Sequence, residues 1–173
     1  IAMDSVFNMI SIARYDLPQL AESEELRLKI LSSSNELYRN LLEQSGNPDR
    51  PYLAVGYHRG LAEIESDFGN HEEAVVQYRL ALASQERMVN EMPDSLYQLS
   101  ALAVLYKELG NALGQIGEPK LSSERINQAT RLFERLVVDS PDDVFNLVEL
   151  MYLRSSSYIE LEKRNLPEAI NSY

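Results

Sequence analysis

Residues 52–99 read "YLAVGYHRGLAEIESDFGNHEEAVVQYRLALASQERMVNEMPDSLYQL", and residues 100–147 read "SALAVLYKELGNALGQIGEPKLSSERINQATRLFERLVVDSPDDVFNL". The second stretch repeats the pattern of the first at a constant offset of 48 residues, without a gap. The matched pairs are Leu61 with Leu109, Gly69 with Gly117, Ala81 with Ala129, Arg87 with Arg135, Pro93 with Pro141 and Asp94 with Asp142. A fixed period in this size range is typical of solenoids and related helical arrays.

Partial copies flank the two complete ones. A third copy begins at Val148 and runs to the end of the sequence, where Arg164 takes the glycine place and Ala169 takes the place of Ala74. An earlier half copy is visible in residues 35–53. We therefore predict a single domain over residues 1–173, with an N-terminal helical hairpin at 1–48, repeats at 49–93 and 94–141, and a truncated repeat at 142–173.

Each unit is predicted to consist of two helices. Apolar residues recur at helical spacing through residues 95–116, in a stripe too wide for a helix with a single neighbour. Pro93 and Pro141 predict helix ends, and the Asp and Ser residues after them predict caps for the next helix. Gly69 and Gly117 predict the turn inside each unit. The sequence thus predicts an all-α fold of stacked helical hairpins.

The stretches "LAEIESDFGNHEEAVVQYRLA" (residues 61–81) and "LGNALGQIGEPKLSSERINQA" (residues 109–129) resemble the tetratricopeptide repeat. The pattern is carried by Leu61, Ala62, Gly69, Ala74, Tyr78 and Ala81, and by Leu109, Gly110, Gly117 and Ala129, whereas Ser122 and Ile126 depart from it. The family's unit has about 34 residues, so each helix here is expected to be longer. The resemblance implies a right-handed α-solenoid with a concave groove for a peptide.

A second resemblance concerns context. The stretch "LPQLAESEELRLKILSSSNELYRNLLEQSGNPD" (residues 17–49), followed by units that end in "RMVNEMPDS" and "RLVVDSPDD", is similar to the repeat region after the catalytic domain of bacterial, planctomycete-type serine/threonine protein kinases. This resemblance implies a kinase domain and a membrane span upstream. The chain would then be the recognition and regulatory segment of a larger signalling protein.

Composition limits the possible partners. The sequence has 16 Lys and Arg against 27 Asp and Glu, a net charge of -11, which argues against nucleic acid and anionic membranes as ligands. It has no cysteine, so the cysteine count leaves the cellular compartment undetermined. No apolar run approaches the length of about 20 residues that spans a bilayer, so we expect a soluble segment whose membrane anchor, if any, lies elsewhere.

Residues 57–74 contain short sequences that resemble protein-kinase signatures, but the residues that accompany these signatures in kinases are missing. Asp67, Phe68 and Gly69 spell the metal-binding signature, but His58 and Arg59 are not followed by the catalytic Asp, and no glycine-rich loop precedes them. In the repeat frame we expect Phe68 in the core and Gly69 as a helix C-cap. With only two histidines and no metal-ligand spacing, we predict no catalytic residue, no metal and no cofactor.

The groove-facing positions of the first helices are the predicted binding site. Comparing the copies aligns Arg59, Lys107 and Arg154 in a basic row, and the next row holds Glu63, Asn111 and Tyr158. This row predicts a protein or peptide ligand with an acidic segment or a C-terminal carboxylate. Two alternatives stay open: the basic side chains pair with nearby acids of the chain itself, or the module serves self-association as a homo-oligomer without a peptide ligand.

Overall fold

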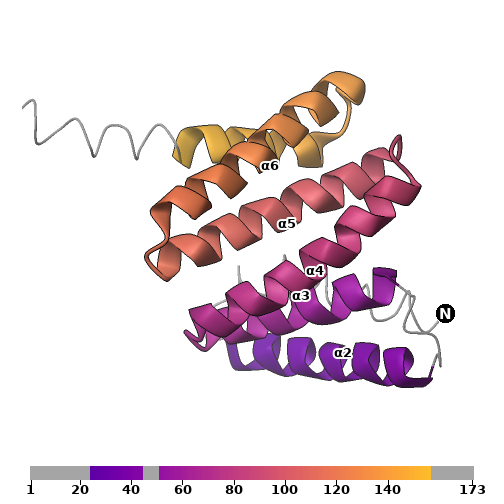
Figure 1. Cartoon of the computed structure of the whole chain (residues 1–173), viewed down its shortest axis with the longest axis vertical. Helices are drawn as coiled ribbons and strands as arrows, with labels where there is room; N and C mark the ends of the chain where they lie inside the picture. The colour runs from indigo at the N-terminus through magenta and orange to yellow at the C-terminus, as the bar shows by residue number, and fades with distance from the viewer. Residues whose placement is uncertain (1–23, 45–50, 157–173) are drawn as a thin grey trace, which may run out of the picture.

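The computed structural model describes residues 24–44 and 51–156. These residues form helices and the short turns between them, without a β-strand. The helices are α2 (Glu24–Gln44), α3 (Pro51–Asp67), α4 (His71–Glu91), α5 (Leu96–Gln115), α6 (Pro119–Asp139) and a last one over residues 144–156, called helix 144–156 below. Figure 1 shows them stacked in chain order, from α2 at one end to α6 and helix 144–156 at the other.

Packing follows the order of the chain. Helix α2 packs on α3, α3 on α4, α4 on α5 and α5 on α6. The connections from α3 to α6 are only a few residues long, so these successive helices run antiparallel. The predicted all-α fold is confirmed. Helix α2 lies within the span of the predicted N-terminal hairpin, while residues 1–23, 45–50 and 157–173 lie outside the described part of the chain.

The period of 48 residues is visible in the backbone. Helices α4 and α6 begin at His71 and Pro119 and end at Glu91 and Asp139, so both bounds differ by the same offset. The glycines that precede these helices have φ angles of 81° and 79°, in the left-handed region that glycine adopts without strain. The prediction that Gly69 and Gly117 form the turn inside each unit is therefore confirmed.

The junctions between units are capped as the sequence predicts. The side chain of Ser95 accepts a hydrogen bond from the backbone nitrogen of Gln98 at 3.4 Å, at the start of α5. At the equivalent place, Asp143 Oδ1 accepts from the nitrogens of Phe145 and Asn146 at 3.0 and 3.4 Å. Both contacts satisfy backbone donors that the first turn of a helix leaves free.

Helix α5 lies between two apolar clusters. Its residues Leu102, Leu105 and Leu109 pack against α3 and α4, in a cluster that includes Ala62, Ala74, Val75, Tyr78, Ala81 and Leu82. On the opposite side its residues Leu99, Ala103 and Val104 pack with Ala129, Phe133 and Leu136 of α6 and with Leu150 and Leu153. The predicted helix with neighbours on two sides is confirmed, because α5 contributes residues to both clusters.

The close approach of α5 and α6 depends on Gly110. A Cβ atom added at this residue would lie 2.9 Å from the side chain of Ile126 and 3.2 Å from the carbonyl oxygen of Ser122. Because the 2.9 Å contact is shorter than real Cβ contacts and the 3.2 Å contact is tighter than most of them, any larger residue here would force Ile126 or the α6 backbone to shift.

One packing expectation is wrong. Phe68, expected in the core, has 63% of its side chain exposed. It is the first residue after α3 and stands in the turn before Gly69, so it lies outside the face that α3 packs against its neighbours.

Candidate functional site

Arg59 and Lys107 both connect one first helix to the next. Arg59 of α3 donates from Nε to Glu108 Oε2 of α5 at 2.9 Å, and its Nη2 donates to Glu108 Oε1. The planar guanidinium therefore binds the carboxylate with two parallel bonds, the strongest geometry of such a pair. Glu63, one turn along α3, places a second carboxylate oxygen 3.8 Å from Arg59 Nε.

Lys107 repeats this contact at the following junction. Its Nζ lies 2.6 Å from Glu149 Oε2 of helix 144–156 and 5.9 Å from the ring centre of Tyr152. Only 16% and 15% of the two charged side chains are exposed, and the values for Arg59 and Glu108 are 19% and 16%. These two predicted basic groups thus have partly buried carboxylate partners within the chain, and Arg154, the third, has an exposed one.

Arg154 lies in a different place from Arg59 and Lys107. Its Nη2 contacts Glu134 Oε1 of α6 at 2.8 Å, and 63% of its side chain is exposed. At an offset of 48, Arg154 and Glu134 correspond to Tyr106 and Glu86, which form a hydrogen bond of 3.0 Å between the hydroxyl and the carboxylate. Arg154 therefore takes the place of Tyr106, because the register stays at 48 in this part of the third unit.

A groove of about 410 Å³ opens beside the Lys107 contact, where α5, the start of α6 and helix 144–156 meet. It is lined by uncharged side chains, both polar and apolar, together with one glycine: Asn111, Gly114, Gln115, Ser122, Ile126, Tyr152, Leu153 and Ser156. Asn111 is exposed and is the predicted groove residue that this hollow contains. Tyr158, the remaining predicted residue, lies outside the described part of the chain.

The sequence comparison missed the contribution of α6. Ser122 and Ile126 were noted only as departures from the tetratricopeptide pattern, at positions where the first unit has Ala74 and Tyr78. Both equivalents are buried in the first unit, whereas Ser122 and Ile126 are only partly buried and line the groove. Their departure from the tetratricopeptide pattern is therefore the sequence signal for these two groove residues.

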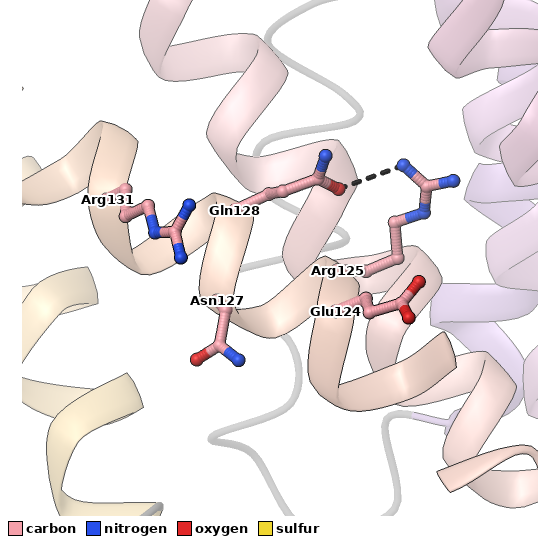
Figure 2. Close-up of a pocket in the computed structure, with 5 residues that line it drawn as sticks. All are labelled: Glu124, Arg125, Asn127, Gln128 and Arg131. Atoms are coloured by element: carbon pink, nitrogen blue, oxygen red, sulfur yellow. Dashed lines mark hydrogen bonds between the residues drawn. The ribbon is translucent and has the colours of Figure 1, made fainter. Parts of the chain in front are cut away.

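A second hollow, of about 320 Å³, lies on the surface of α6 (Figure 2). It is lined by Glu124, Arg125, Asn127, Gln128 and Arg131, and Arg125 Nη1 donates to Gln128 Oε1 at 2.9 Å. The guanidinium of Arg125 also lies 5.7 Å from the ring centre of Tyr106. Because all five lining residues come from one helix, the hollow is a surface feature with a single described wall.

The hydroxyl of Tyr106 has a raised pKa. Burial raises the pKa of its hydroxyl to about 12, and the hydrogen bond to Glu86 and the charge of that carboxylate act in the same direction. Arg125 acts in the opposite direction as the smallest of these influences. The hydrogen bond joins α4 with α5, and Arg125 brings α6 to the same contact.

The two histidines and the kinase-like residues lie at ordinary helix contacts and helix ends. His58 Nδ1 lies 2.9 Å from Gln77 Oε1, a contact between α3 and α4, and His71 is the first residue of α4. Asp67 ends α3, and Gly69 forms the turn that follows. Within residues 24–44 and 51–156, no group of three His, Cys, Asp or Glu side chains is placed to hold a metal ion.

Comparisons with protein-family models, with curated proteins and with solved structures find no significant match to this chain. Among the described helices, none combines the length and the apolar character needed to cross a membrane.

Proposed function

We propose that this chain is a non-catalytic protein-interaction module, a right-handed solenoid of 48-residue helical hairpins that binds an extended peptide along its first helices. The observation that supports this proposal best is the groove beside Lys107, which combines exposed polar groups with apolar side chains on three helices. Peptide sites commonly have this character, since apolar contacts supply affinity and a few polar groups fix orientation.

The side chains of the groove suit a peptide backbone. Asn111 and Gln115 offer amide donors and acceptors, and Ser122 offers a hydroxyl. Ile126 and Leu153 add apolar surface for one ligand side chain. All of these residues stand on helices rather than loops, so little conformational entropy is lost when a ligand binds.

The charge of the ligand is a separate part of the proposal. An acidic segment or a C-terminal carboxylate is the proposed ligand group, and Lys107, which lies beside this groove, is its proposed receptor. Because Lys107 already contacts Glu149, a ligand carboxylate has to displace that side chain or share the three donors of the ammonium group. The same exchange is required at Arg59, where Glu108 occupies both arms of the guanidinium.

The proposed setting is a larger serine/threonine protein kinase, in which this module recruits a substrate or a regulator. The support is the sequence resemblance of residues 17–49 and of the two repeat ends. The test is the coding sequence upstream, which must encode a glycine-rich loop, a strand lysine and a catalytic Asp in the usual order.

Peptide binding can be tested with a randomised peptide library displayed with free C-termini, followed by fluorescence anisotropy of an enriched peptide. We expect Asn111→Ala to weaken binding about tenfold, because an amide contact that the bound peptide would bury is lost. The matched control is Asn127→Ala, which removes an exposed amide of α6 outside the groove and should leave affinity unchanged. A library without enriched peptides, or equal affinities of both variants for the peptide, would contradict the proposal that this groove binds a peptide.

Glu149→Gln tests the ligand charge independently. Removing the competing carboxylate frees Lys107, so the enriched peptide should gain affinity, whereas its C-terminally amidated form should not. Equal affinities of the two forms would leave the groove in place and overturn carboxylate recognition.

A further inference from the structure

Each of the three described first helices carries an exposed aromatic residue at its second position. These residues are Tyr52 in α3, Tyr97 in α5 and Phe145 in helix 144–156, with 43%, 70% and 42% of the residue exposed. The last two are separated by the repeat offset of 48. Single exposed apolar residues are normal on a protein surface, but a position that is aromatic and exposed in each described unit points to an interaction.

Tyr97 and Phe145 lie at the same edge of the stack. In Figure 1 the turns that lead into α5 and helix 144–156 are both at the right-hand side, opposite the turn between α5 and α6. Near the starts of these two helices, Ser100 Oγ donates to Asn146 Oδ1 at 2.8 Å. Further exposed apolar side chains flank the two rings in the sequence. We call the whole set the aromatic edge, which comprises Met92, Leu96, Tyr97, Val138, Val144 and Phe145.

The same edge carries carboxylates that helix stability does not explain. Glu91 ends α4 and Asp139 ends α6, and neither helix has a basic residue in its last turn. A negative charge at a helix C-terminus is unfavourable, because the helix dipole is negative there. Asp139 contacts Arg135 at 3.3 Å. By contrast, Glu91, Asp94 and Asp142 are exposed and form no salt bridge with a described residue.

We propose that the aromatic edge binds a cationic segment of another protein, whose Arg or Lys side chains lie over the rings of Tyr97 and Phe145. A cation within about 6 Å of a ring centre is attracted by the negative face of the ring. One partly buried ring of the chain has such a partner, because Arg125 lies 5.7 Å from the ring centre of Tyr106. Among the described residues no cationic side chain lies over Tyr97 or Phe145, so both rings are available.

Charge and spacing both fit such a segment. The carboxylates of Asp94 and Asp142 stand three residues before the two rings and attract a cation to this edge. Helices that pack on each other have axes about 8–10 Å apart, and an extended chain presents side chains on one face about 7 Å apart. Long cationic side chains at alternate positions of an extended segment therefore reach both rings.

This site goes beyond the proposed peptide groove. No residue of the aromatic edge lines the groove, and the two ligands carry opposite charges. Asn111→Ala, which tests the groove, should therefore bind a cationic segment like the original protein. A failure of either proposal leaves the other in place.

Fluorescence anisotropy of the 173-residue protein with a labelled peptide that has arginine at alternate positions tests the proposal. The matched peptide has citrulline at the same positions, which keeps the shape of the side chain without its charge. The ionic strength is set to about 0.15 M, where long-range attraction between exposed charges is largely screened. We expect saturable binding of the arginine peptide and at least about tenfold weaker binding of the citrulline peptide.

The rings are tested by Tyr97→Leu combined with Phe145→Leu, which keeps the apolar character of both positions. We expect the dissociation constant of the arginine peptide to rise at least about fivefold, because two cation–π contacts are lost. The matched control is Phe68→Leu, at an aromatic residue 63% exposed at the opposite edge, and it should leave the dissociation constant unchanged. Circular dichroism of both variants confirms that the helices are retained.

The carboxylates are tested by Asp94→Asn combined with Asp142→Asn. The matched control, Glu72→Gln combined with Glu124→Gln, removes the same charge from exposed side chains away from the aromatic edge. We expect the first double variant to bind the arginine peptide at least about threefold more weakly, and the control to bind it like the original protein.

Four results would overturn the proposal. The first is the absence of saturable binding of the arginine peptide, and the second is equal binding of the citrulline peptide. The third is an unchanged dissociation constant in either double variant of the edge. The fourth is an equal loss in the matched controls, since binding would then follow the net charge of the chain. Weaker binding by Asn111→Ala would also overturn it, by placing the arginine peptide in the groove.

Discussion

The junction of α4 with α5 buries a polar residue at a position where the equivalent junction of α6 with helix 144–156 buries an aromatic one. Gln85 of α4 is 2% exposed, and its Nε2 donates to the carbonyl oxygen and to Oε1 of Gln98, each at 2.9 Å. Its equivalent at the offset of 48 is Phe133, which is 0% exposed. Here the buried polar residue is Asn146, which accepts a hydrogen bond from Ser100 at 2.8 Å.

This difference shows that the repeat fixes which positions are buried. It constrains the type of residue at those positions less strictly. Gln98 and Asn146 occupy the same register position and are both buried, yet they obtain their hydrogen bonds from different helices. Because a buried amide must be satisfied, each junction needs its own partner residue. The units are therefore alike in geometry and distinct in chemistry, which disfavours packing in the wrong order.

The largest expected difference between the junctions comes from removing their central side chains. Phe133→Ala should lower the free energy of unfolding by about 3–5 kcal/mol, because it leaves a cavity in a packed cluster. Gln85→Ala should cost less, about 1–3 kcal/mol, chiefly because Gln98 loses its donor. Urea unfolding of both variants gives the comparison, and an equal loss would show that the two centres are energetically equivalent despite their chemistry.

Removing the ion pairs between first helices should lower the free energy of unfolding by smaller amounts. The loss should be larger for pairs with more hydrogen bonds and less exposure. Arg59→Met removes two bonds to Glu108 and should cost about 1–3 kcal/mol, whereas Lys107→Met removes one and should cost about 1 kcal/mol. Arg154→Met is the exposed control, with an expected cost under about 1 kcal/mol.

A double-mutant cycle of Arg59 with Glu108, measured by urea unfolding, isolates the pair from other contacts. If the coupling free energy of this pair were no larger than that of Arg154 with Glu134, partial burial would not strengthen the pair of Arg59 with Glu108.

The helix caps should differ between junctions by less than the ion pairs do. Asp143→Ala removes bonds to two backbone nitrogens and to the side chain of Asn146 and should cost about 1–2 kcal/mol, whereas Ser95→Ala removes one bond and should cost about 0.5–1 kcal/mol. Thermal unfolding of the two variants should show the larger drop in Tm for Asp143→Ala, and the reverse order would contradict this assignment of the caps.

Much of the fold could be predicted from the sequence because its signals are local. Proline and glycine fix helix ends through backbone geometry, so Pro93, Gly69 and Gly117 locate the turns correctly. The wide apolar stripe of residues 95–116 correctly indicates a helix packed on two sides. Phe68 was placed wrongly, because one residue past a helix end the helical period no longer tells where a side chain points.

The groove could be predicted only in part, because its residues depend on contacts between units. Sequence spacing identifies Asn111 on a first helix, but Ser122 and Tyr152 join it only through the packing of three helices. The pairing of Arg59 with Glu108 and of Lys107 with Glu149 follows from no spacing within a unit, since the partners come from the next unit. Arg154 was aligned one residue out of register, and only the matched contact of Tyr106 with Glu86 reveals the shift.

The contact of Tyr106 with Glu86 and its equivalent, Arg154 with Glu134, should respond differently to alkaline pH. Burial raises the pKa of Tyr106 to about 12 from an ordinary value of 10.0, so the folded state favours the protonated hydroxyl. The stabilisation is fully present below pH 10 and is lost as the pH rises toward about 12, because the unfolded chain loses its proton first.

Tyr106→Phe should therefore be less stable than the original protein near neutral pH, and its stability should fall less steeply between pH 10 and about 12. Urea unfolding at a series of alkaline pH values measures both slopes. Arg154→Met should keep the slope of the original protein, because the Arg154 guanidinium stays charged over this range. If Tyr106→Phe also kept that slope, the loss of stability at high pH would arise from the growing negative charge of the whole chain rather than from this junction.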